Sequence, residues 1–283
     1  MKSTVMLIVL LCVCLPTVGW GQQAIIAHAD NGQSQTQSGI IPYDAFNGRW
    51  LNPAKWIATD PGNPDYMEAC YFSSSVLECV REIQDGKLRL AIKSYGATDS
   101  NDGGQYGESK SMFAQPFTSV TFDVLVKSTN SSGCTASGQS SLAQAMITAR
   151  FFNTGSGDPN DDVDAHITWA HASTDNPGLL NVSAFLFWQG QYFDFVTLGS
   201  ATVGTPLRAT LRWVPDSHKF VAGFENLVTH QHFGGDVPYT MSDTTPATGY
   251  WNGFYVQSFP ANCIGEQTSS QIEATFDNVV IGQ

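Results

Sequence analysis

Three side chains capable of acid–base chemistry alternate along one short segment, at Asp162, Asp164 and His166. Alternate residues of a β-strand point to the same side, so a strand here would present two carboxyl groups and an imidazole on one face. Such groups move protons during bond cleavage. We therefore take these three as candidate catalytic residues, with a lyase that uses His166 or His171 as its base as one alternative. A polar strand face without chemistry is the other interpretation.

The same segment is rich in the oxygen ligands that Ca²⁺ prefers. Asp158, Asn160 and Asp162 place side-chain oxygens at alternate positions. Val163 stands where an EF-hand loop needs a glycine, and the distal glutamate is missing, so the segment is not an EF-hand. The pattern predicts either a structural Ca²⁺ site or an ordinary turn rich in aspartate and asparagine.

Aromatic side chains are frequent in the second half of the chain. Aromatic faces stack on the C–H faces of sugar rings, and polar edges hold sugar hydroxyls. Packing in the core is the alternative, because half of the side chains of a buried strand point inward. The candidate ligand-binding residues are Trp169, His171, Trp188, Tyr192 and Trp251.

The composition limits the possible partners. The chain has 283 residues, of which 13% are charged, and its formal net charge is −12. Such a surface repels phosphate backbones and anionic lipid, which excludes nucleic acid as an expected partner and disfavours anionic polysaccharides. Neutral carbohydrate and divalent cations remain compatible with this charge.

The beginning of the chain is typical of a secretory signal peptide. Lys2 precedes an apolar run at Val5–Leu15 that is too short to span a bilayer, and the small residues Gly19 and Gly21 fit cleavage after Gly21. We expect a signal peptide over residues 1–21, no membrane span after its removal, and a secreted, extracellular or periplasmic protein. Residues 22–42 are polar and are expected to form a disordered linker.

Four cysteines remain after the leader, and an even number in an exported chain indicates disulfides. Three pairings are possible, and we favour Cys70 with Cys79 and Cys134 with Cys263. A zinc site is the rival interpretation, which the absence of any C-x-x-C spacing disfavours.

Alternation of apolar and polar residues predicts strands along the whole chain after the linker. In the segment 120–127, four apolar residues alternate with polar ones, and Gln189-Gly190 predicts a tight hairpin turn. Ten or more strands at this spacing indicate one all-β domain over residues 43–283, built as an antiparallel sandwich or barrel. The expected strands are 87–94, 120–127, 144–152, 164–170, 180–188, 192–198, 207–214, 219–225, 253–259 and 271–281.

Short motifs at both ends of this domain carry a family resemblance. Phe46-Asn47-Gly48 with Leu51 and Trp56, then Gly86-Lys87-Leu88-Arg89-Leu90, and finally Phe276-Asp277-Asn278-Val279 resemble the concanavalin A-like lectin and glucanase superfamily. The resemblance implies a two-sheet jelly-roll sandwich whose first and last strands lie side by side. It also implies that Trp56 or Phe46 packs against the last strand and that Asp277 contributes to a structural Ca²⁺ site.

The segment from Asp162 to His166 is similar in position to the carboxylate strand of glycoside hydrolase family 16. That family uses E-x-D-x-E, whereas here Asp162 is one methylene shorter and His166 replaces the acid. Retaining hydrolysis needs two well-placed carboxyl groups, so the departure argues against this activity. The leading hypothesis is a lectin-like domain that binds carbohydrate. The alternatives are a polysaccharide-cleaving enzyme and a structural or adhesive extracellular protein.

Overall fold

A computed structural model describes residues 40–57, 70–72, 77–100, 106–249 and 252–283. The chain divides into two compact units, Met1–Ser38 and Gly39–Gln283, and all the described residues belong to the second. The predicted signal peptide and residues 22–39 of the predicted linker lie outside the described residues. Residues 40–42 already belong to the first strand.

The described residues form two antiparallel sheets, and the only helices among them are two 3₁₀ turns, η2 (Pro159–Asp161) and η3 (Pro215–Ser217). The eight-stranded sheet has the strand order β14 (His232–Pro238), β13 (Lys219–Asn226), β12 (Leu207–Val214), β7 (Ser119–Ser131), β17 (Ser269–Gly282), β5 (Lys87–Tyr95) and β4 (Leu77–Gln84), with β1 (Ile40–Asp44) paired to β17.

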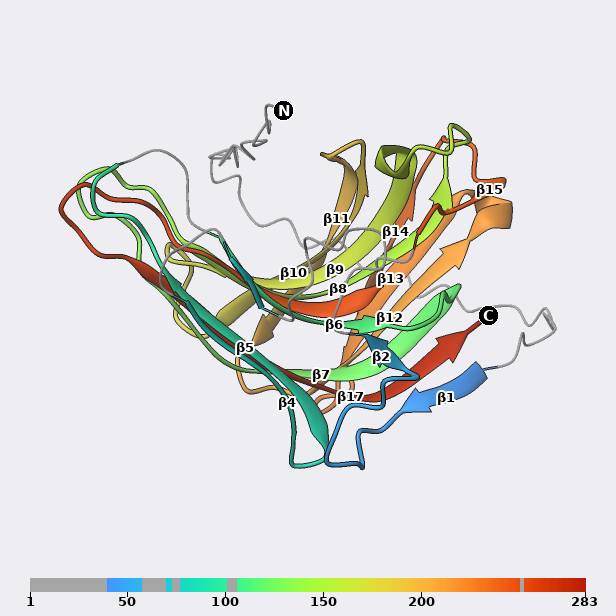
Figure 1. Ribbon diagram of the computed structural model, residues 1–283, viewed down its shortest axis with the longest axis horizontal. Coiled ribbons are helices and arrows are strands. Elements are labelled where there is room, and N and C mark those ends of the chain that lie inside the picture. The colour runs from blue at the N-terminus through green and yellow to red at the C-terminus, as the bar shows by residue number, and fades with distance from the viewer. Residues whose placement is uncertain (1–39, 58–69, 73–76, 101–105, 250–251) are drawn as a thin grey trace. The chain divides into compact units, whose positions relative to one another are not determined.

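The nine-stranded sheet contains the strands that carry most of the candidate site residues (Figure 1). Its order is β11 (Gln191–Thr202), β10 (Leu179–Trp188), β9 (Asp162–Ala172), β8 (Leu142–Asn153), β16 (Gly253–Phe259), β6 (Gly107–Phe113) and β2 (Trp56–Ile57), with β15 (Thr245–Pro246) on β8 and β3 (Cys70–Phe72) on β6. The prediction of an all-β, two-sheet antiparallel jelly-roll sandwich is confirmed.

Local sequence explains the strands and their connections. Buried and more accessible residues alternate along β5, where Leu88, Leu90 and Ile92 point into the core. The β10–β11 hairpin turns at Gln189 and Gly190, which both have positive φ angles, of 51° and 72°. Two consecutive positive φ angles match the right-handed twist of the strands, so this turn fixes the register of the hairpin.

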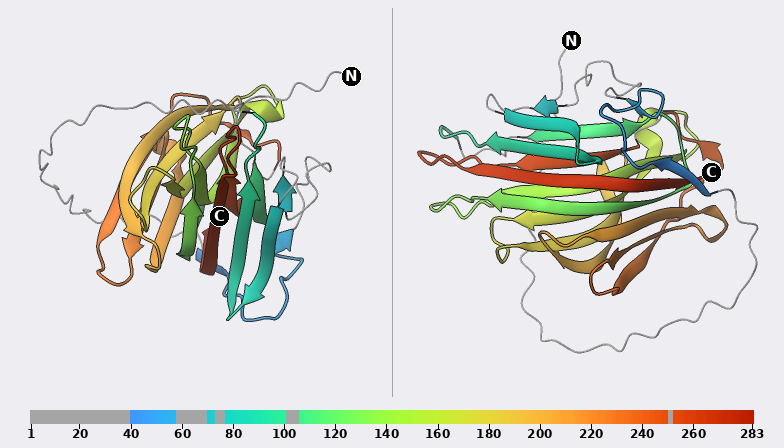
Figure 2. Two further views of the ribbon diagram at one scale, coloured as in Figure 1. Left: turned by 90° about the vertical axis from the view of Figure 1, so that its left-hand side faces the viewer. Right: turned by 90° about the horizontal axis from the view of Figure 1, so that it is seen from below.

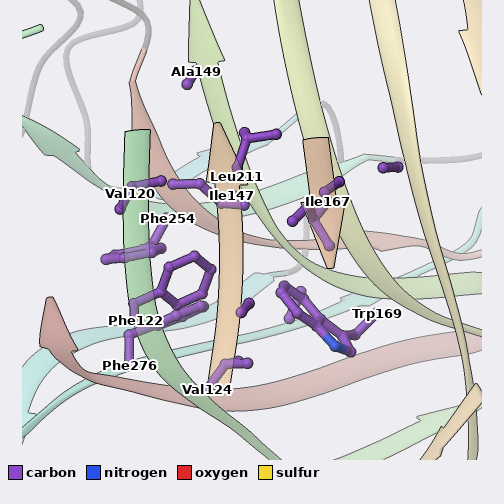
Figure 3. Close-up of a cluster of buried hydrophobic side chains, with 14 of the residues drawn as sticks. Val120, Phe122, Val124, Ile147, Ala149, Ile167, Trp169, Leu211, Phe254 and Phe276 are labelled. Carbon is purple, nitrogen blue, oxygen red and sulfur yellow. The ribbon is translucent and has the colours of Figure 1, made fainter. Parts of the chain in front are cut away.

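Aromatic side chains from both sheets meet in one core (Figure 3). The rings of Phe122 on β7 and Phe254 on β16 lie 4.7 Å apart, and Phe254 stacks on Phe276 of β17 at 4.4 Å. Trp169 on β9 packs edge-on against Phe122 and is 0% exposed. Its ring is therefore enclosed by the core and has no face open to a sugar, so the ligand-binding role of Trp169 stays a prediction from the sequence alone.

The first and last described strands lie side by side, as the family resemblance implied. In β1, Ile41 pairs with Ile281 of β17, and β17 itself runs between β5 and β7 (Figure 2). The Trp56 ring contacts Phe46 at 5.2 Å, and its Nε1 donates a hydrogen bond to Asp44 Oδ2 at 2.7 Å. These contacts give Trp56 a packing role at the start of the domain.

A disulfide joins Cys134 to Cys263 and so confirms one of the two predicted pairings. Cys79 is also disulfide-bonded, whereas the side chain of Cys70 lies outside the described residues, so the pairing between these two stays a prediction. Within the described ranges, no helix is long and apolar enough to span a bilayer.

Candidate functional site

The strand β9 divides its side chains between the core and the opposite face of the nine-stranded sheet. Ala165 and Ile167 are buried in the core, so Asp164, His166 and Thr168 point to the other side. We call this side of the nine-stranded sheet the outer face. The predicted alternation of Asp162, Asp164 and His166 on one face therefore agrees with the strand geometry.

The pairing register aligns outer-face residues of five strands in one row across the sheet. We call this the central row, and it consists of Phe195, Phe185, His166, Thr148 and Gly253. Neighbouring strands lie about 4.8 Å apart, so the row is ~19 Å long. It begins at the edge strand β11, where Phe195 is 71% exposed.

His166 lies in the middle of the central row and contacts its neighbours closely. Its ring stacks on Phe185, with centroids 4.5 Å apart and planes 11° from parallel, and Phe187 packs edge-on at 6.2 Å. Its Nδ1 forms a 2.9 Å hydrogen bond with Thr148 Oγ1. His166 is only 7% exposed, and its Nε2 is buried without a hydrogen-bond partner among the described residues.

The surroundings of His166 keep its ring neutral. Burial, together with the positive charge of Arg150, lowers the pKa of His166 to about 3. A buried imidazole with so low a pKa is a weak base near neutral pH, although it still forms hydrogen bonds. The site therefore suits hydrogen bonding through Nε2 better than proton abstraction by His166.

Arg150 on β8 binds both carboxylates of the segment. Its Nε donates to Asp164 Oδ1 at 2.8 Å, and its Nη1 lies 3.2 Å from Asp162 Oδ2. Asp162 also accepts hydrogen bonds from Asn153 Nδ2 at 2.8 Å and from Thr248 Oγ1 at 2.7 Å. Because its oxygens are occupied in this way, Asp162 has a structural role in this arrangement.

Asp164 is the titratable carboxyl group of the site. Burial raises the pKa of Asp164 to about 6, while Arg150 lowers it and Asp162 raises it. The balance shows that burial outweighs the ion pair. A carboxyl group with a pKa near neutrality can donate a proton as well as accept a hydrogen bond.

Amide and charged side chains form a chain of hydrogen bonds in a second row of the outer face. Gln144 Nε2 donates to Gln257 Oε1 at 2.6 Å, and Gln257 Nε2 donates to Glu108 Oε2 at 2.8 Å. Glu108 is also ion-paired with Lys110, at 3.1 Å. Glu108 and Lys110 come from β6, which the sequence patterns did not predict.

The sequence signal for β6 was weak because two of its inward-pointing residues are serines. Ser109 and Ser111 take these positions, and Ser109 Oγ donates to the carbonyl of Val80 at 2.7 Å. The alternation of Glu108 with Lys110 on the other side was the only periodic feature.

Gly253 leaves room on β16 for the Tyr255 ring, since a Cβ atom at position 253 would lie 2.9 Å from Tyr255 Cε2.

The predicted ligand-binding residues are dispersed. His171 shares the inward orientation of Trp169, and its Nδ1 donates to the carbonyl of Leu179 at 2.9 Å. Trp188 is partly buried against the core, and its ring meets Phe193 edge-on at 5.8 Å. The side chain of Tyr192 and the whole of Trp251 lie outside the described residues.

The predicted calcium ligands do not converge. Asp158 caps η2 by accepting from the Asn160 backbone N–H at 2.9 Å, and Asp277 Oδ2 pairs with Lys87 Nζ at 3.1 Å on the other sheet. The guanidinium of Arg150 already provides a cation beside Asp162. In the part of the chain that the structure describes, no three acidic, histidine or cysteine side chains cluster. Calcium binding at these residues stays a prediction.

Comparisons with known proteins give likenesses in structure alone. No family model and no curated protein matches the sequence. Among solved structures, the lectin UEA-II complexed with galactose is 7% identical at a TM-score of 0.39 and covers 86% of this chain and 99% of its own. Winged bean acidic lectin, complexed with methyl-alpha-D-galactose, is 10% identical at 0.36 and covers 76% and 98%. Arcelin-5 from Phaseolus vulgaris, a lectin-like defense protein, is 9% identical at 0.35 and covers 86% and 99%. At these values, no residue role is transferred.

Proposed function

We propose that this protein binds a neutral carbohydrate on the outer face of the nine-stranded sheet, along the central row. The observation that carries the proposal is the environment of His166, whose ring stacks on Phe185 while its buried Nε2 has no hydrogen-bond partner in the part of the chain that the structure describes. Buried polar groups are nearly always paired, so an unpaired one on such a face suits a ligand. Sugar-binding sites combine aromatic faces, which stack on the sugar ring, with polar groups that form hydrogen bonds to it.

Charge balance on the outer face supports a neutral ligand. The positive charge of Arg150 is matched by Asp162 and Asp164, and that of Lys110 by Glu108. An anionic sugar would therefore meet carboxylates without a spare cation among these residues. The formal net charge of −12 on the whole chain also disfavours an anionic ligand.

The accessible end of the central row suits ring stacking. Phe195 is paired with Phe185 across β11 and β10, and most of its surface is exposed. Phe193 on the same strand is also exposed. An incoming sugar ring can rest on Phe195 at the sheet edge, whereas the deeper residues of the row provide the hydrogen bonds.

Binding to insoluble polysaccharides and to a glycan array tests the proposal. The variant Phe195→Ser is expected to lower affinity about tenfold, equivalent to about 1.4 kcal/mol. Val228→Ser is the matched control, because Val228 is similarly exposed but belongs to the turn between β13 and β14. The proposal fails if no neutral glycan binds, or if the two variants lose the same affinity.

Cleavage of the bound chain is a second candidate, which one observation favours. Burial raises the pKa of Asp164 to about 6, within the range of a general acid near neutral pH. Release of reducing ends or of unsaturated sugars from a bound polysaccharide would support cleavage. Release that survives in the variant Asp164→Asn would remove Asp164 from the mechanism.

The proposed location is extracellular. The disulfide between Cys134 and Cys263 supports it, because such bonds persist in oxidising compartments and are rare in the cytosol. Cleavage after Gly21 is part of the same proposal. N-terminal sequencing of protein recovered from the culture medium tests it, and a chain that stays cell-bound with residue 1 intact contradicts it.

A further inference from the structure

The hydrogen bond between Thr148 and His166 has two possible directions. Either the imidazole carries its proton on Nδ1 and donates to Thr148 Oγ1, or the threonine hydroxyl donates to a bare Nδ1. In the second case the imidazole proton is on Nε2. The choice decides whether the unpaired Nε2 offers an acceptor or a donor to whatever lies above the sheet.

The groups left unpaired differ between the two directions. If Nδ1–H donates, the Thr148 hydroxyl proton and the Nε2 lone pair are left without partners, because Thr148 Oγ1 bonds to no other group among the described residues. If Thr148 donates, Nε2–H and the lone pairs of Thr148 Oγ1 are left instead. A hydroxyl oxygen is a weaker acceptor than a neutral imidazole nitrogen, so the second direction leaves the less costly acceptor unpaired and is the more stable one.

We propose that Thr148 holds His166 in the Nε2–H tautomer, and that the site recognises its ligand by donating this proton to an uncharged oxygen. Suitable acceptors on a sugar are a hydroxyl, a ring oxygen or an acetyl carbonyl. This inference rests on the proposed carbohydrate binding for the nature of the ligand, whereas the tautomer is a property of the free protein.

The groups around His166 explain why the acceptor is uncharged. Asp164 occupies the neighbouring outer-face position on β9, and Arg150 is held between Asp164 and Asp162. A ligand carboxylate placed against Nε2 would lie near these two acidic side chains. The low pKa of His166, about 3, keeps the ring from becoming an imidazolium that would attract an anion.

Two-bond ¹H–¹⁵N correlation spectra of the full-length protein measure the tautomer directly. For the wild type we expect His166 to show a protonated Nε2 and a bare Nδ1, unchanged from pH 8 to pH 5. The variant Thr148→Val is expected to shift His166 to a mixture of tautomers. Thr148→Ser retains the hydroxyl and is expected to restore the wild-type spectrum.

Thr210→Val is the matched control, because Thr210 pairs its hydroxyl with Thr121 on the other sheet. It is expected to leave the His166 signals unchanged. A wild-type spectrum with the proton on Nδ1, or with an imidazolium at pH 7, overturns the proposal without any ligand. Because this spectrum comes from the unchanged chain, the proposal stays falsifiable even if Thr148→Val fails to fold.

Titration with soluble polysaccharides tests the ligand class. Galactomannan and xyloglucan are the neutral probes, and polygalacturonate is the anionic one. We expect a neutral probe to move the Nε2–H signal and polygalacturonate to bind at least tenfold more weakly. If a neutral probe binds without moving that signal, the donor role of His166 is overturned and carbohydrate binding stands. If none of the three binds, the ligand class proposed here is overturned, whereas the tautomer is decided by the spectrum of the free protein.

Discussion

The outer surfaces of the two sheets use similar polar residues in very different surroundings. On the eight-stranded sheet, Arg208 pairs with Asp123 at 2.8 Å with 47% of the arginine side chain exposed. On the nine-stranded sheet, Arg150 pairs with Asp164 at the same distance with only 13% exposed. The first surface is an ordinary solvated sheet face, whereas the second keeps its charges away from water.

This difference shows that the type of residue does not reveal which face carries a site. Exposed ion pairs contribute little because water screens them, so the Arg208 pair needs no functional reason. Burying charges is costly, and the cost is offset only by close pairing. Buried ion pairs are therefore an unusual feature of this face, and the group of Arg150, Asp162 and Asp164 is the one that lies close to His166.

The largest expected effect is the loss of the buried cation. Arg150→Met leaves Asp162 and Asp164 without their common partner, and we expect the free energy of unfolding to fall by about 3–5 kcal/mol. Arg208→Met on the other sheet should cost less than about 1 kcal/mol. Urea denaturation at pH 7 measures both, and equal losses would remove the distinction between the two faces.

The second effect is a pH dependence with opposite signs for neighbouring residues. Asp164 has its pKa raised from 3.8 to about 6, so the folded state binds its proton more tightly and stability falls as pH rises from 4 to 6. His166 has its pKa lowered from 6.5 to about 3, so the folded state binds its proton less tightly and stability rises over the same range. The two contributions oppose each other in the wild type.

Single variants separate these two contributions. Relative to the wild type, Asp164→Asn should make the slope of unfolding free energy against pH more positive between pH 4 and 6, and His166→Gln more negative. Each change is at most about 1.4 kcal/mol per pH unit. Urea denaturation at half-unit steps of pH measures them, and unchanged slopes would mean that these residues are not buried as the structure shows.

The smallest expected effect concerns the hydrogen bond that Thr248 donates to Asp162 at 2.7 Å. Thr248→Val removes a bond to a buried carboxylate and should cost about 1.5 kcal/mol in the free energy of unfolding. Thr121→Val removes an exposed hydroxyl pair with Thr210 and should cost less than about 0.5 kcal/mol. Thermal unfolding of both variants measures these losses. A larger loss of stability for Thr121→Val than for Thr248→Val would contradict the prediction.

Much of the fold follows from alternation in the sequence. The expected strands at 207–214 and 253–259 coincide with β12 and β16, because apolar residues occupy most of their inward positions. By contrast, β6 was missed because Ser109 and Ser111 take inward positions. A polar inward residue is stable only where a partner from another strand meets it, and sequence periodicity does not show that partner.

The candidate site was predictable in part. Alternation correctly placed Asp164 and His166 together, and the same alternation places Trp169 and His171 on the opposite side of β9. Trp169 and His171 were named as ligand-binding residues because residue type was weighed above strand parity. Arg150 and Phe185 were missed because their proximity to His166 depends on the pairing of β8, β9 and β10, which no local pattern specifies.

The bond between Cys134 and Cys263 encloses a covalent ring of the main chain, with a sequence separation of 129. All five members of the central row lie inside that ring. A protease that cuts one peptide bond between the two cysteines would leave both fragments attached, so a nicked molecule would migrate as one species until a reducing agent is added. By constraining the unfolded chain, such a ring is worth about 5 kcal/mol in the chain-entropy treatment.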